Sequence, residues 1–294
     1  MTGYFHKTVM GAQMAEAIGN PERGVVFDGT VGSGGFSEMV LERTGPEVRL
    51  VATDVDPAAV AAATERLARF GGRATVLLRS YAQVASILDE LGIERLVGAV
   101  LDLGLSSALL DGEGGFSFRQ DAALDMRMDA TLAVTARDLL NGSTAKELTR
   151  ILGDYGEVRG AHPLARAIED ECRAGRMERT ADLVRVVQDV FPSSGAKQLS
   201  RVFQAIRIAV NCELANLERF LADAGARLAV GGRIAILSFH SLEDRIVKQS
   251  FHEWEKAGTH RRGTKKPVGP EEAEVAVNRR ARSAKMRWAE RVAA

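Results

Sequence analysis

The most constraining stretch of the sequence is a glycine-rich turn between an apolar strand and a helical pattern. Residues 25–28 form a short β-branched and aromatic run that ends in Asp28, and four glycines follow between positions 29 and 35. An amphipathic pattern then begins at Glu38, so the order predicts strand, tight turn and helix. Glycines let a ligand approach the backbone, and the first turn of a helix offers free N–H groups. The stretch is typical of the nucleotide-cofactor corner of a doubly wound α/β sheet.

A second strand-end acid supports a nucleoside cofactor. Residues 50–54 are another apolar strand, and the terminal Asp54 stands 20 residues after Gly34. An acid in this place typically accepts hydrogen bonds from ribose hydroxyls. The alternative role for Asp54 is a helix cap before Pro57. The glycine turn favours the cofactor role.

The residues of the turn favour S-adenosylmethionine over a dinucleotide. The nicotinamide fingerprint has Gly or Ala at its third glycine site, where this chain has Ser37. Asp28 would repel a pyrophosphate, whereas an acid suits the ammonium and sulfonium groups of S-adenosylmethionine. The sequence therefore predicts S-adenosylmethionine as the cofactor. An NAD-binding enzyme or a non-catalytic scaffold of the same fold is the alternative.

The composition allows two domains and demands a local patch for any nucleic-acid binding. The chain has 294 residues, with 39 Lys+Arg balanced by 39 Asp+Glu, so bulk charge attracts no polyanion. Cys172 and Cys212 lack metal-ligand spacing, and we expect both to be buried in a protein of the reducing cytoplasm. The sequence has no apolar run of roughly 18 residues, as a membrane span needs, and its start does not resemble a signal peptide.

Strands and helices alternate up to about residue 103, which predicts a parallel sheet with right-handed crossovers. The predicted strands are 24–28, 49–54, 74–78 and 97–103, and the predicted helices are 13–18, 36–43, 57–70 and 82–91. We interpret His6, near the start, as a lone surface histidine.

The alternation stops between residues 110 and 210, which we predict to be an inserted all-helical domain. Its helices are expected at 144–152 behind a capping box at Thr144, at 162–173, and at 181–190 with Thr180 as cap. A long helix with apolar residues at helical spacing follows over 199–221. The sheet resumes with strand 233–238, then a helix capped by Ser241, and 284–288 is expected as an antiparallel edge strand. The sheet domain thus comprises 1–109 and 211–294.

The fourth strand ends in a further acid, Asp102. Because ligands bind outside the carboxyl ends of such strands, we expect Asp28, Asp54 and Asp102 to converge on one site. Asp102 is predicted to accept a hydrogen bond from the adenine or from a substrate amine, and its alternative role is a turn cap. Ser106 and Ser107, which follow it, are weaker candidates, because serines commonly cap helices.

The fifth strand ends in Phe239 and His240. An aromatic ring there can stack on a base, and the histidine can hydrogen-bond or move a proton. The alternative is a core phenylalanine with a structurally satisfied histidine. His240 and His252 are too isolated in sequence to predict a metal site.

The C-terminal segment 259–294 is basic, with ten Lys or Arg residues against four Glu. We predict that it contacts RNA phosphates, with Arg279, Arg280 and Arg282 beside the last strand. The alternative is a solvated tail that binds nothing.

Taken together, these stretches resemble the RsmH/MraW family, which methylates the N4 amine of a P-site cytosine in small-subunit (16S) ribosomal RNA. The resemblance covers nearly the whole chain in order. The matching segments are 28–35 (DGTVGSGG), 102–107 (DLGLSS), 115–118 (GFSF), 124–129 (LDMRMD), 203–208 (FQAIRI), 210–214 (VNCEL), 238–245 (SFHSLEDR) and 281–285 (ARSAK).

The resemblance implies a class I S-adenosylmethionine-dependent methyltransferase sheet (Rossmann-like) with an inserted helical substrate-recognition domain. It implies cofactor contacts at Gly34, Gly35, Phe36, Asp54, Tyr81 and Asp102. This chain departs from the family in having Phe36 where His is usual, Leu109 where Gln is usual, Gly114 where Arg is usual and Arg279 where Pro is usual. We therefore expect position 36 to serve the cofactor through its backbone N–H.

The predicted function is methylation of a small-subunit rRNA cytosine on N4, with Asp102 and His240 as catalytic candidates. A DNA amino-methyltransferase would need the same chemistry. Those enzymes usually show Pro-Pro-aromatic after the strand-four acid, whereas residues 103–105 are Leu-Gly-Leu.

Overall fold

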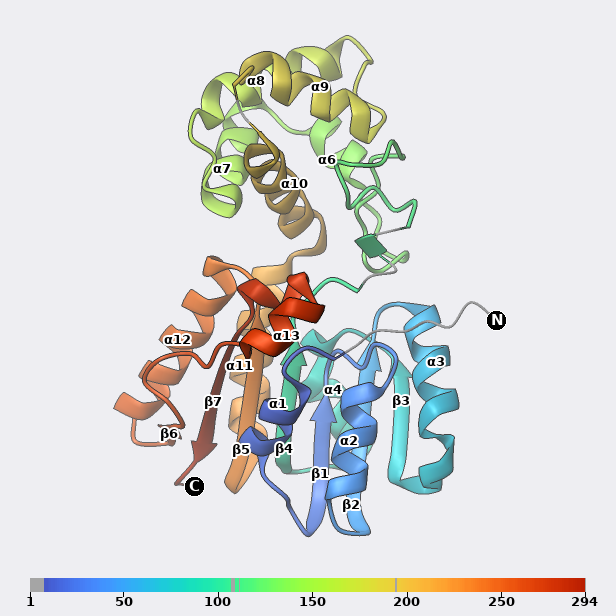
Figure 1. Ribbon diagram of the computed structural model, residues 1–294, viewed down its shortest axis with the longest axis vertical. Coiled ribbons are helices and arrows are strands. Elements are labelled where there is room, and N and C mark those ends of the chain that lie inside the picture. The colour runs from blue at the N-terminus through green and yellow to red at the C-terminus, as the bar shows by residue number, and fades with distance from the viewer. Residues whose placement is uncertain (1–7, 107–108, 111, 194, 294) are drawn as a thin grey trace. The chain divides into compact units, whose positions relative to one another are not determined.

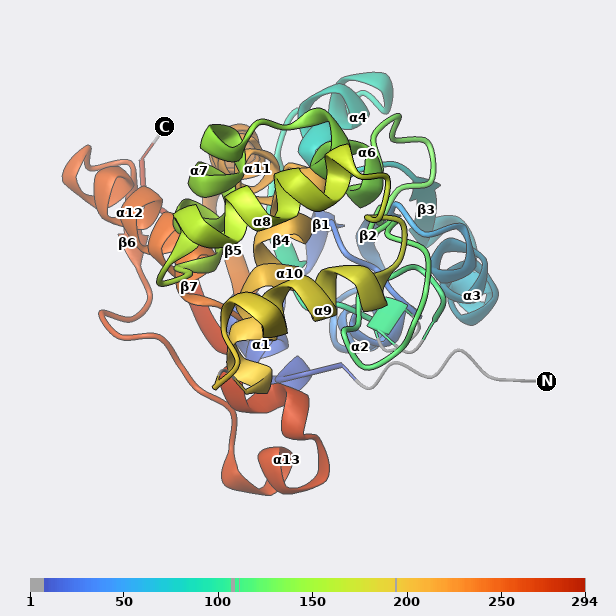
Figure 2. The same ribbon diagram turned by 90° about the horizontal axis from the view of Figure 1, so that it is seen from above.

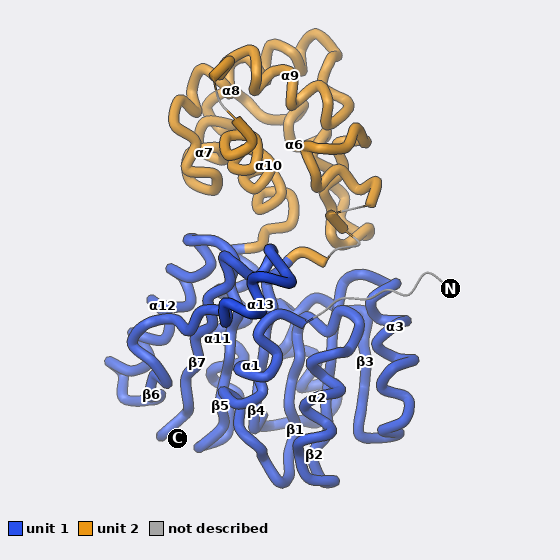
Figure 3. The backbone as a smooth tube through the Cα atoms, in the orientation of Figure 1, with its two compact units in different colours: residues 1–104, 214–294 blue, residues 105–213 orange. Residues whose placement is uncertain are grey.

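The computed structural model describes residues 8–106, 109–110, 112–193 and 195–293. His6 and Ser107 lie outside the described residues. The chain divides into two compact units, one made of 1–104 and 214–294 and the other of 105–213 (Figure 3). We call them the sheet unit and the helical unit. The predicted insertion, 110–210, falls inside the helical unit and ends a few residues short of it at both sides.

The sheet unit is built on seven strands in the order β3-β2-β1-β4-β5-β7-β6 (Figure 1). Strands β1 to β5 run parallel, while β7 is antiparallel to both of its neighbours. The strand order reverses direction between β1 and β4, and in open α/β sheets ligands bind at such a point. The strands are β1 Arg23–Asp28, β2 Glu47–Asp54, β3 Ala74–Leu78, β4 Leu96–Asp102, β5 Leu228–Ser238, β6 His260–Arg262 and β7 Lys285–Arg291.

Helices cover both faces of the sheet, as Figures 1 and 2 show. Alternate strand residues serve the two faces: Val26 packs in one core cluster, and Val25 and Phe27 pack in the other, as the period of two along a strand requires. One face carries α1 Gly11–Ile18, α2 Gly35–Arg43 and α3 Pro57–Leu67, and the other carries α4 Val84–Glu90, α11 Glu213–Arg227 and α12 Ser241–Lys256.

Short helices complete the sheet unit. They are η1 Ala68–Arg73, η2 Tyr81–Gln83, α13 Glu272–Val277 and η3 Arg279–Ser283. The predicted helix 57–70 is therefore α-helical only to Leu67 and continues as the 3-10 helix η1. Within the described part of the chain, no helix has the length and apolar character that a membrane span requires.

The helical unit has a hydrophobic core of its own, which includes Leu148, Leu164, Leu183 and Phe203. Capping boxes at Thr135 and Thr144 start two of its helices, the second as predicted. Its helices are α6 Ala136–Gly142, α7 Ala145–Gly156, α8 Ala161–Arg173, α9 Thr180–Val190 and α10 Ala196–Asn211.

The predicted long helix 199–221 is wrong, because the chain breaks at Cys212. This residue adopts a left-handed conformation with φ 50°, which ends α10 before α11 begins. The side chain of the preceding Asn211 donates to the carbonyl of Met126 and accepts from the N–H of Met128, both at 2.7 Å. Apolar periodicity continues across the break, so the sequence pattern did not reveal it. Cys212 is exposed and Cys172 half-buried, contrary to the expectation that both are buried.

Two further expectations are corrected. The late strand β7 is antiparallel as predicted, but it is not the edge strand, because the three-residue β6 pairs with its outer side. The sequence did not predict β6, because this short basic strand has no alternation of apolar residues. Thr180 does not cap α9: its hydroxyl donates to the carbonyl of Gln120 and accepts from the N–H of Ala122. The carboxylate of Asp182 instead accepts from the N–H of Arg179 at the helix start.

Candidate active site

The glycine turn after β1 has the geometry that the sequence predicts. Gly32 and Gly34 have φ of 50° and 79°, a region that disfavours residues with a side chain. A Cβ on Gly35 would lie 2.9 Å from Oγ1 of Thr8 and 3.0 Å from Nη1 of Arg66. A side chain at position 35 would therefore collide with its neighbours, whereas a Cβ on Gly32 would face open space.

Gly29 brings the turn against Tyr81. A Cβ on Gly29 would lie 2.3 Å from Cδ2 of Leu101 and 2.7 Å from Cβ of Tyr81, closer than real contacts allow. The Tyr81 ring packs edge-on against Phe220, with ring centroids 5.7 Å apart. The residue at 81 is thus fixed beside the end of β1.

Asp28 organises the turn from inside. The residue is only 2% exposed, and its carboxylate accepts from Oγ of Ser37 at 2.6 Å and from the N–H of Thr30 at 3.1 Å. Burial raises the pKa of Asp28 to about 6, against the lowering effect of those two hydrogen bonds. Ser37, which departs from the dinucleotide fingerprint, thus serves as the partner of the strand-end acid.

Asp54 faces the same turn from the end of β2. Its carboxylate accepts from the N–H of Gly32 at 2.9 Å and from the N–H of Asp56 at 3.1 Å. Burial raises its pKa above the ordinary value. Asp56 is the residue that caps α3, because it accepts from the N–H of Ala58. The helix-cap alternative for Asp54 is therefore wrong.

Asp102 ends β4, and Thr30 ties it to the turn. The Asp102 N–H donates to Oγ1 of Thr30 at 2.7 Å, and the carboxylate accepts from the N–H of Gly104 at 3.1 Å. Burial, together with the negative charges of Asp28 and Glu243, raises the pKa of Asp102 to about 7. The strand-end acids Asp28, Asp54 and Asp102 are thus brought together, as expected, and they favour a cationic ligand.

The Phe239 ring lies against Gly104, the residue that follows the β4 end by two. A Cβ on Gly104 would lie 2.9 Å from Cε2 of Phe239 and 3.1 Å from Oδ1 of Asp102. The aromatic ring and the carboxylate therefore flank the same glycine. This arrangement brings a stacking surface and a hydrogen-bond acceptor to one edge of the sheet.

His240 has a structural role that the sequence analysis gave only as an alternative. It is the N-cap of α12, and its Nδ1 accepts from the N–H of Glu243 at 3.4 Å. Its Nε2 lies 3.1 Å from Oε1 of Glu243, within ion-pair distance but not aligned for a hydrogen bond. Ser241 is the first residue of the helix and does not cap it, so that expectation is wrong.

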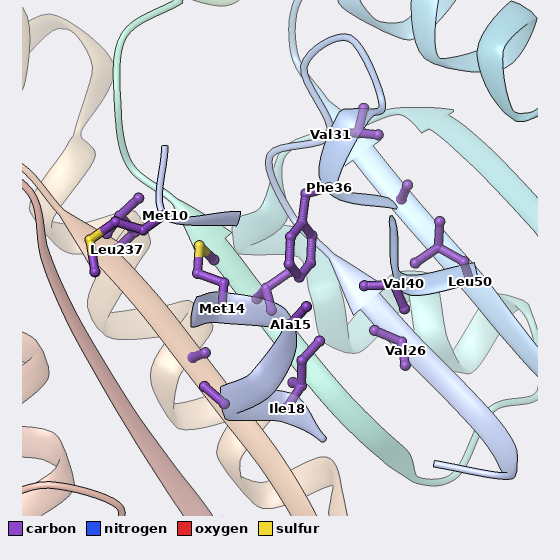
Figure 4. Close-up of a cluster of buried hydrophobic side chains, with 14 of the residues drawn as sticks. Met10, Met14, Ala15, Ile18, Val26, Val31, Phe36, Val40, Leu50 and Leu237 are labelled. Carbon is purple, nitrogen blue, oxygen red and sulfur yellow. The ribbon is translucent and has the colours of Figure 1, made fainter. Parts of the chain in front are cut away.

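The Phe36 ring belongs to the core of the sheet unit. The residue is 7% exposed, and Figure 4 shows its ring pointing toward Met14 and Ala15, with Val40 nearby. Position 36 is the second residue of α2, where backbone N–H groups have no partner inside the helix. The N–H is therefore the group that position 36 can offer a ligand.

Two of the other candidates lie in the helical unit. Oγ of Ser106 accepts from the N–H of Leu109 at 3.2 Å, which is the capping role expected of such a serine. Leu109 itself packs against the core of that unit.

Much of the basic tail is engaged in structure. Arg287 is buried and pairs with Asp244 at 2.6 Å, and Arg261 pairs with Glu290 at 3.1 Å. Other members of the tail that bind acids or carbonyls are Arg262, Lys285 and Arg291. Within the described ranges, Lys265, Lys266, Arg279 and Arg282 are exposed and form no ion pair. The candidate phosphate footprint is thus smaller than the sequence count.

Sequence reasoning missed Thr30 and Glu243. Thr30 joins the β1 turn to β4 through one backbone hydrogen bond that no pattern encodes. Glu243 did leave a signal, because it stands three residues after His240, the spacing of a capping box.

The model of the MraW methylase family matches residues 3–292. This chain belongs to the MraW methylase family. A relative from Geotalea uraniireducens is 41% identical over 312 residues, which cover 99% of this chain and 100% of that protein. One from Ralstonia pickettii is 43% identical over 316 residues, which cover 99% and 98%. Both are called ribosomal RNA small subunit methyltransferase H.

A solved structure of an rRNA methylase from Streptococcus thermophilus aligns over 98% of this chain and 99% of its own. Its identity to this chain is 11% and its TM-score is 0.45. Family membership confirms the predicted family, methyltransferase activity and S-adenosylmethionine cofactor, and the seven-stranded sheet confirms the predicted fold class.

Proposed function

We propose that this chain transfers the methyl group of S-adenosylmethionine to the N4 amine of a cytosine in the P-site region of 16S rRNA. Support comes from the family match over residues 3–292 and from relatives at 41–43% identity that carry the rRNA methyltransferase name. The observation that carries the proposal is the group of carboxyls at the strand ends, Asp28, Asp54 and Asp102, whose pKa values are raised by burial, so that a bound cation would restore their negative charge. That charge suits a sulfonium cofactor and opposes the pyrophosphate of NAD.

The residues present fit the cofactor. Gly34 and Gly35 let the turn pack closely against Ala63, Thr8 and Arg66, where a Cβ would collide, while the space beside Gly32 is open to a ligand. We assign the ribose hydroxyls to Asp54 and a backbone hydrogen bond to the N–H of Phe36. Tyr81 contributes an aromatic side chain beside the end of β1. When bound, the cofactor supplies an electrophilic methyl group on its sulfonium.

Asp102 accepts a hydrogen bond from the target amine. The lone pair of a cytosine amine is delocalised into the ring, so the site must hold the nitrogen in line with the methyl and favour a pyramidal geometry. An ionised carboxylate does both, and the Gly104 N–H holds it in place. The target base must leave its stack to reach the site, and the Phe239 ring offers a surface for it. Both ring nitrogens of His240 face Glu243, so we assign His240 to shaping the loop rather than to taking the proton.

The helical unit and the exposed arginines of the tail are assigned to RNA. Arg279 and Arg282 carry charge that nothing among the described residues neutralises, which suits phosphate contacts that position without choosing the base. The chain then acts in the cytoplasm on the small ribosomal subunit or its rRNA.

Two measurements test the proposal. S-adenosylmethionine should raise the melting temperature, by an amount equivalent to about 2.7 kcal/mol at 100 times its dissociation constant, whereas NAD should not. The methyl-transfer rate on rRNA should rise with pH as Asp102 ionises, with a midpoint at or below about 7, because a bound cation lowers a carboxyl pKa. Stabilisation by NAD alone, or methyl transfer to duplex DNA in place of rRNA, would overturn it.

A further inference from the structure

Glu243 lies at the start of α12, almost completely buried beside the candidate active site. Its side chain is 3% exposed. The carboxylate accepts from the N–H of Phe239 at 2.8 Å and from the N–H of His240 at 3.2 Å. Its other oxygen lies 3.1 Å from Nε2 of His240. One side chain thus holds the two residues that leave β5 through both backbone and ring.

The hydrogen bonds of Glu243 to Phe239 and His240 affect the position of Asp102 through packing. The Phe239 ring lies against Gly104, whose N–H donates to the Asp102 carboxylate. A shift of the backbone at 239 would therefore move the ring, the glycine and the acid together. The same glutamate also acts on Asp102 through its charge. Among the residues that the structure describes, the charged groups that act on Asp102 are Asp28 on β1 and Glu243 on α12.

We propose that Glu243 is a positioning residue of the methyl-transfer site, which fixes the Phe239–His240 segment against Gly104 and so sets the place of Asp102. The inference rests on the proposed function. A capping glutamate whose only task is to start a helix would need no second contact to the residue before the N-cap. Through its hydrogen bond to the N–H of Phe239, Glu243 also fixes the residue that packs beside Asp102.

The test compares Glu243→Ala, Glu243→Gln and a matched control, Asp244→Asn. Asp244 is the neighbouring acid in the same helix turn, but it faces Arg287 and Lys285 on β7. Glu243→Ala should lower kcat for rRNA by about 10- to 100-fold, because misplacement by about 1 Å costs on that order. S-adenosylmethionine affinity should change less than about threefold, since the residues assigned to the cofactor are on other elements. Asp244→Asn should leave kcat within about threefold.

Glu243→Gln separates positioning from folding. It keeps an oxygen to accept from Phe239 and His240 but removes a negative charge that faces Asp102. The pH midpoint of methyl transfer should therefore move down by about half a unit to one unit, whereas a residue that does not lie beside Asp102 would not move it. The ¹³C carboxyl titration of Asp102 should shift likewise, and it needs no RNA, so it remains informative if the rRNA assignment fails.

The outcomes are decisive in each arm. A folded Glu243→Ala with parental kcat and KM overturns the proposal. If the alanine variant does not fold, an unmoved Asp102 titration in Glu243→Gln overturns it. The Asp102 titration could shift as expected in Glu243→Gln while the wild-type protein transfers no methyl group to rRNA. That result would refute the proposed substrate but would support the effect of Glu243 on Asp102.

Discussion

The raised pKa of Asp102 predicts that the site destabilises the protein at neutral pH. The folded carboxyl has a pKa of about 7, whereas its ordinary value is 3.8. Between these two values the folded state keeps a proton that the unfolded state has lost, so unfolding releases a proton and stability falls as pH rises. Asp102→Asn keeps an oxygen to accept from Gly104 but cannot ionise. The variant should therefore be more stable than the parent at pH 8.

The size of the stability difference follows from the gap between the unfolded and folded pKa values of Asp102, 3.8 and about 7. Each unit by which folding raises a carboxyl pKa destabilises the ionised folded state by about 1.4 kcal/mol. The upper limit of the effect of Asp102 on the free energy of unfolding is therefore about 4 kcal/mol. We expect about 2–4 kcal/mol at pH 8, most of it disappearing by pH 4.5. Urea unfolding without cofactor measures it, because the two tryptophans, Trp254 and Trp288, both lie in the sheet unit and report its unfolding.

The control for this experiment is Asp56→Asn. Asp56 caps α3 through the N–H of Ala58, and Asn caps about as well as Asp, so stability should stay within about 0.5 kcal/mol of the parent. An Asp102→Asn variant that is no more stable than the parent at pH 8, or whose advantage is the same at pH 4.5, would refute the reasoning.

Three further variants test other parts of the site. Asp54→Ala should weaken S-adenosylmethionine by about 1.5–3 kcal/mol per lost ribose hydrogen bond, and an unchanged dissociation constant in calorimetry would remove the ribose role. Phe36→His should alter that affinity by less than about tenfold but lower stability by about 1–3 kcal/mol, since it buries a polar ring in the core; a thousandfold tighter complex would show that the side chain itself contacts the cofactor. The double variant Arg279→Ala, Arg282→Ala should weaken rRNA binding and flatten its salt dependence. Arg261→Ala, which loses the ion pair with Glu290, should have a smaller effect. Equal effects would mean that paired and unpaired arginines of the tail bind RNA alike.

Local patterns predicted most of the sheet unit, because strands and tight turns depend on nearby residues. The turn from Asp28 to Ser37, the acids at 54 and 102 and the bounds of β1, β2 and β4 lie close to their predicted places, whereas β5 begins at Leu228 rather than at the predicted Arg233. The glycines and strand-end acids can be predicted from nearby sequence. A tight turn with positive φ favours glycine, and the carboxyl ends of parallel strands lie at one edge of the sheet.

Most failures were at contacts between distant residues. The break at Cys212 depends on Asn211 binding a loop more than 80 residues earlier, and the buried Arg287 depends on Asp244, 43 residues away. A charge count cannot separate such a structural arginine from an exposed one. The cap of α12 was assigned to Ser241 by residue type, although the His240 and Glu243 spacing allowed the correct alternative.

The central claim is that this chain methylates a cytosine of small-subunit rRNA on N4. Mass mapping of that rRNA from cells with and without the gene tests it most directly. The account predicts that one P-site cytosine lacks a single methyl group in the cells without the gene, and that Asp102→Ala fails to restore it while the parental gene does. Identical methylation in both cells, or a missing methyl on any other type of base, would contradict it.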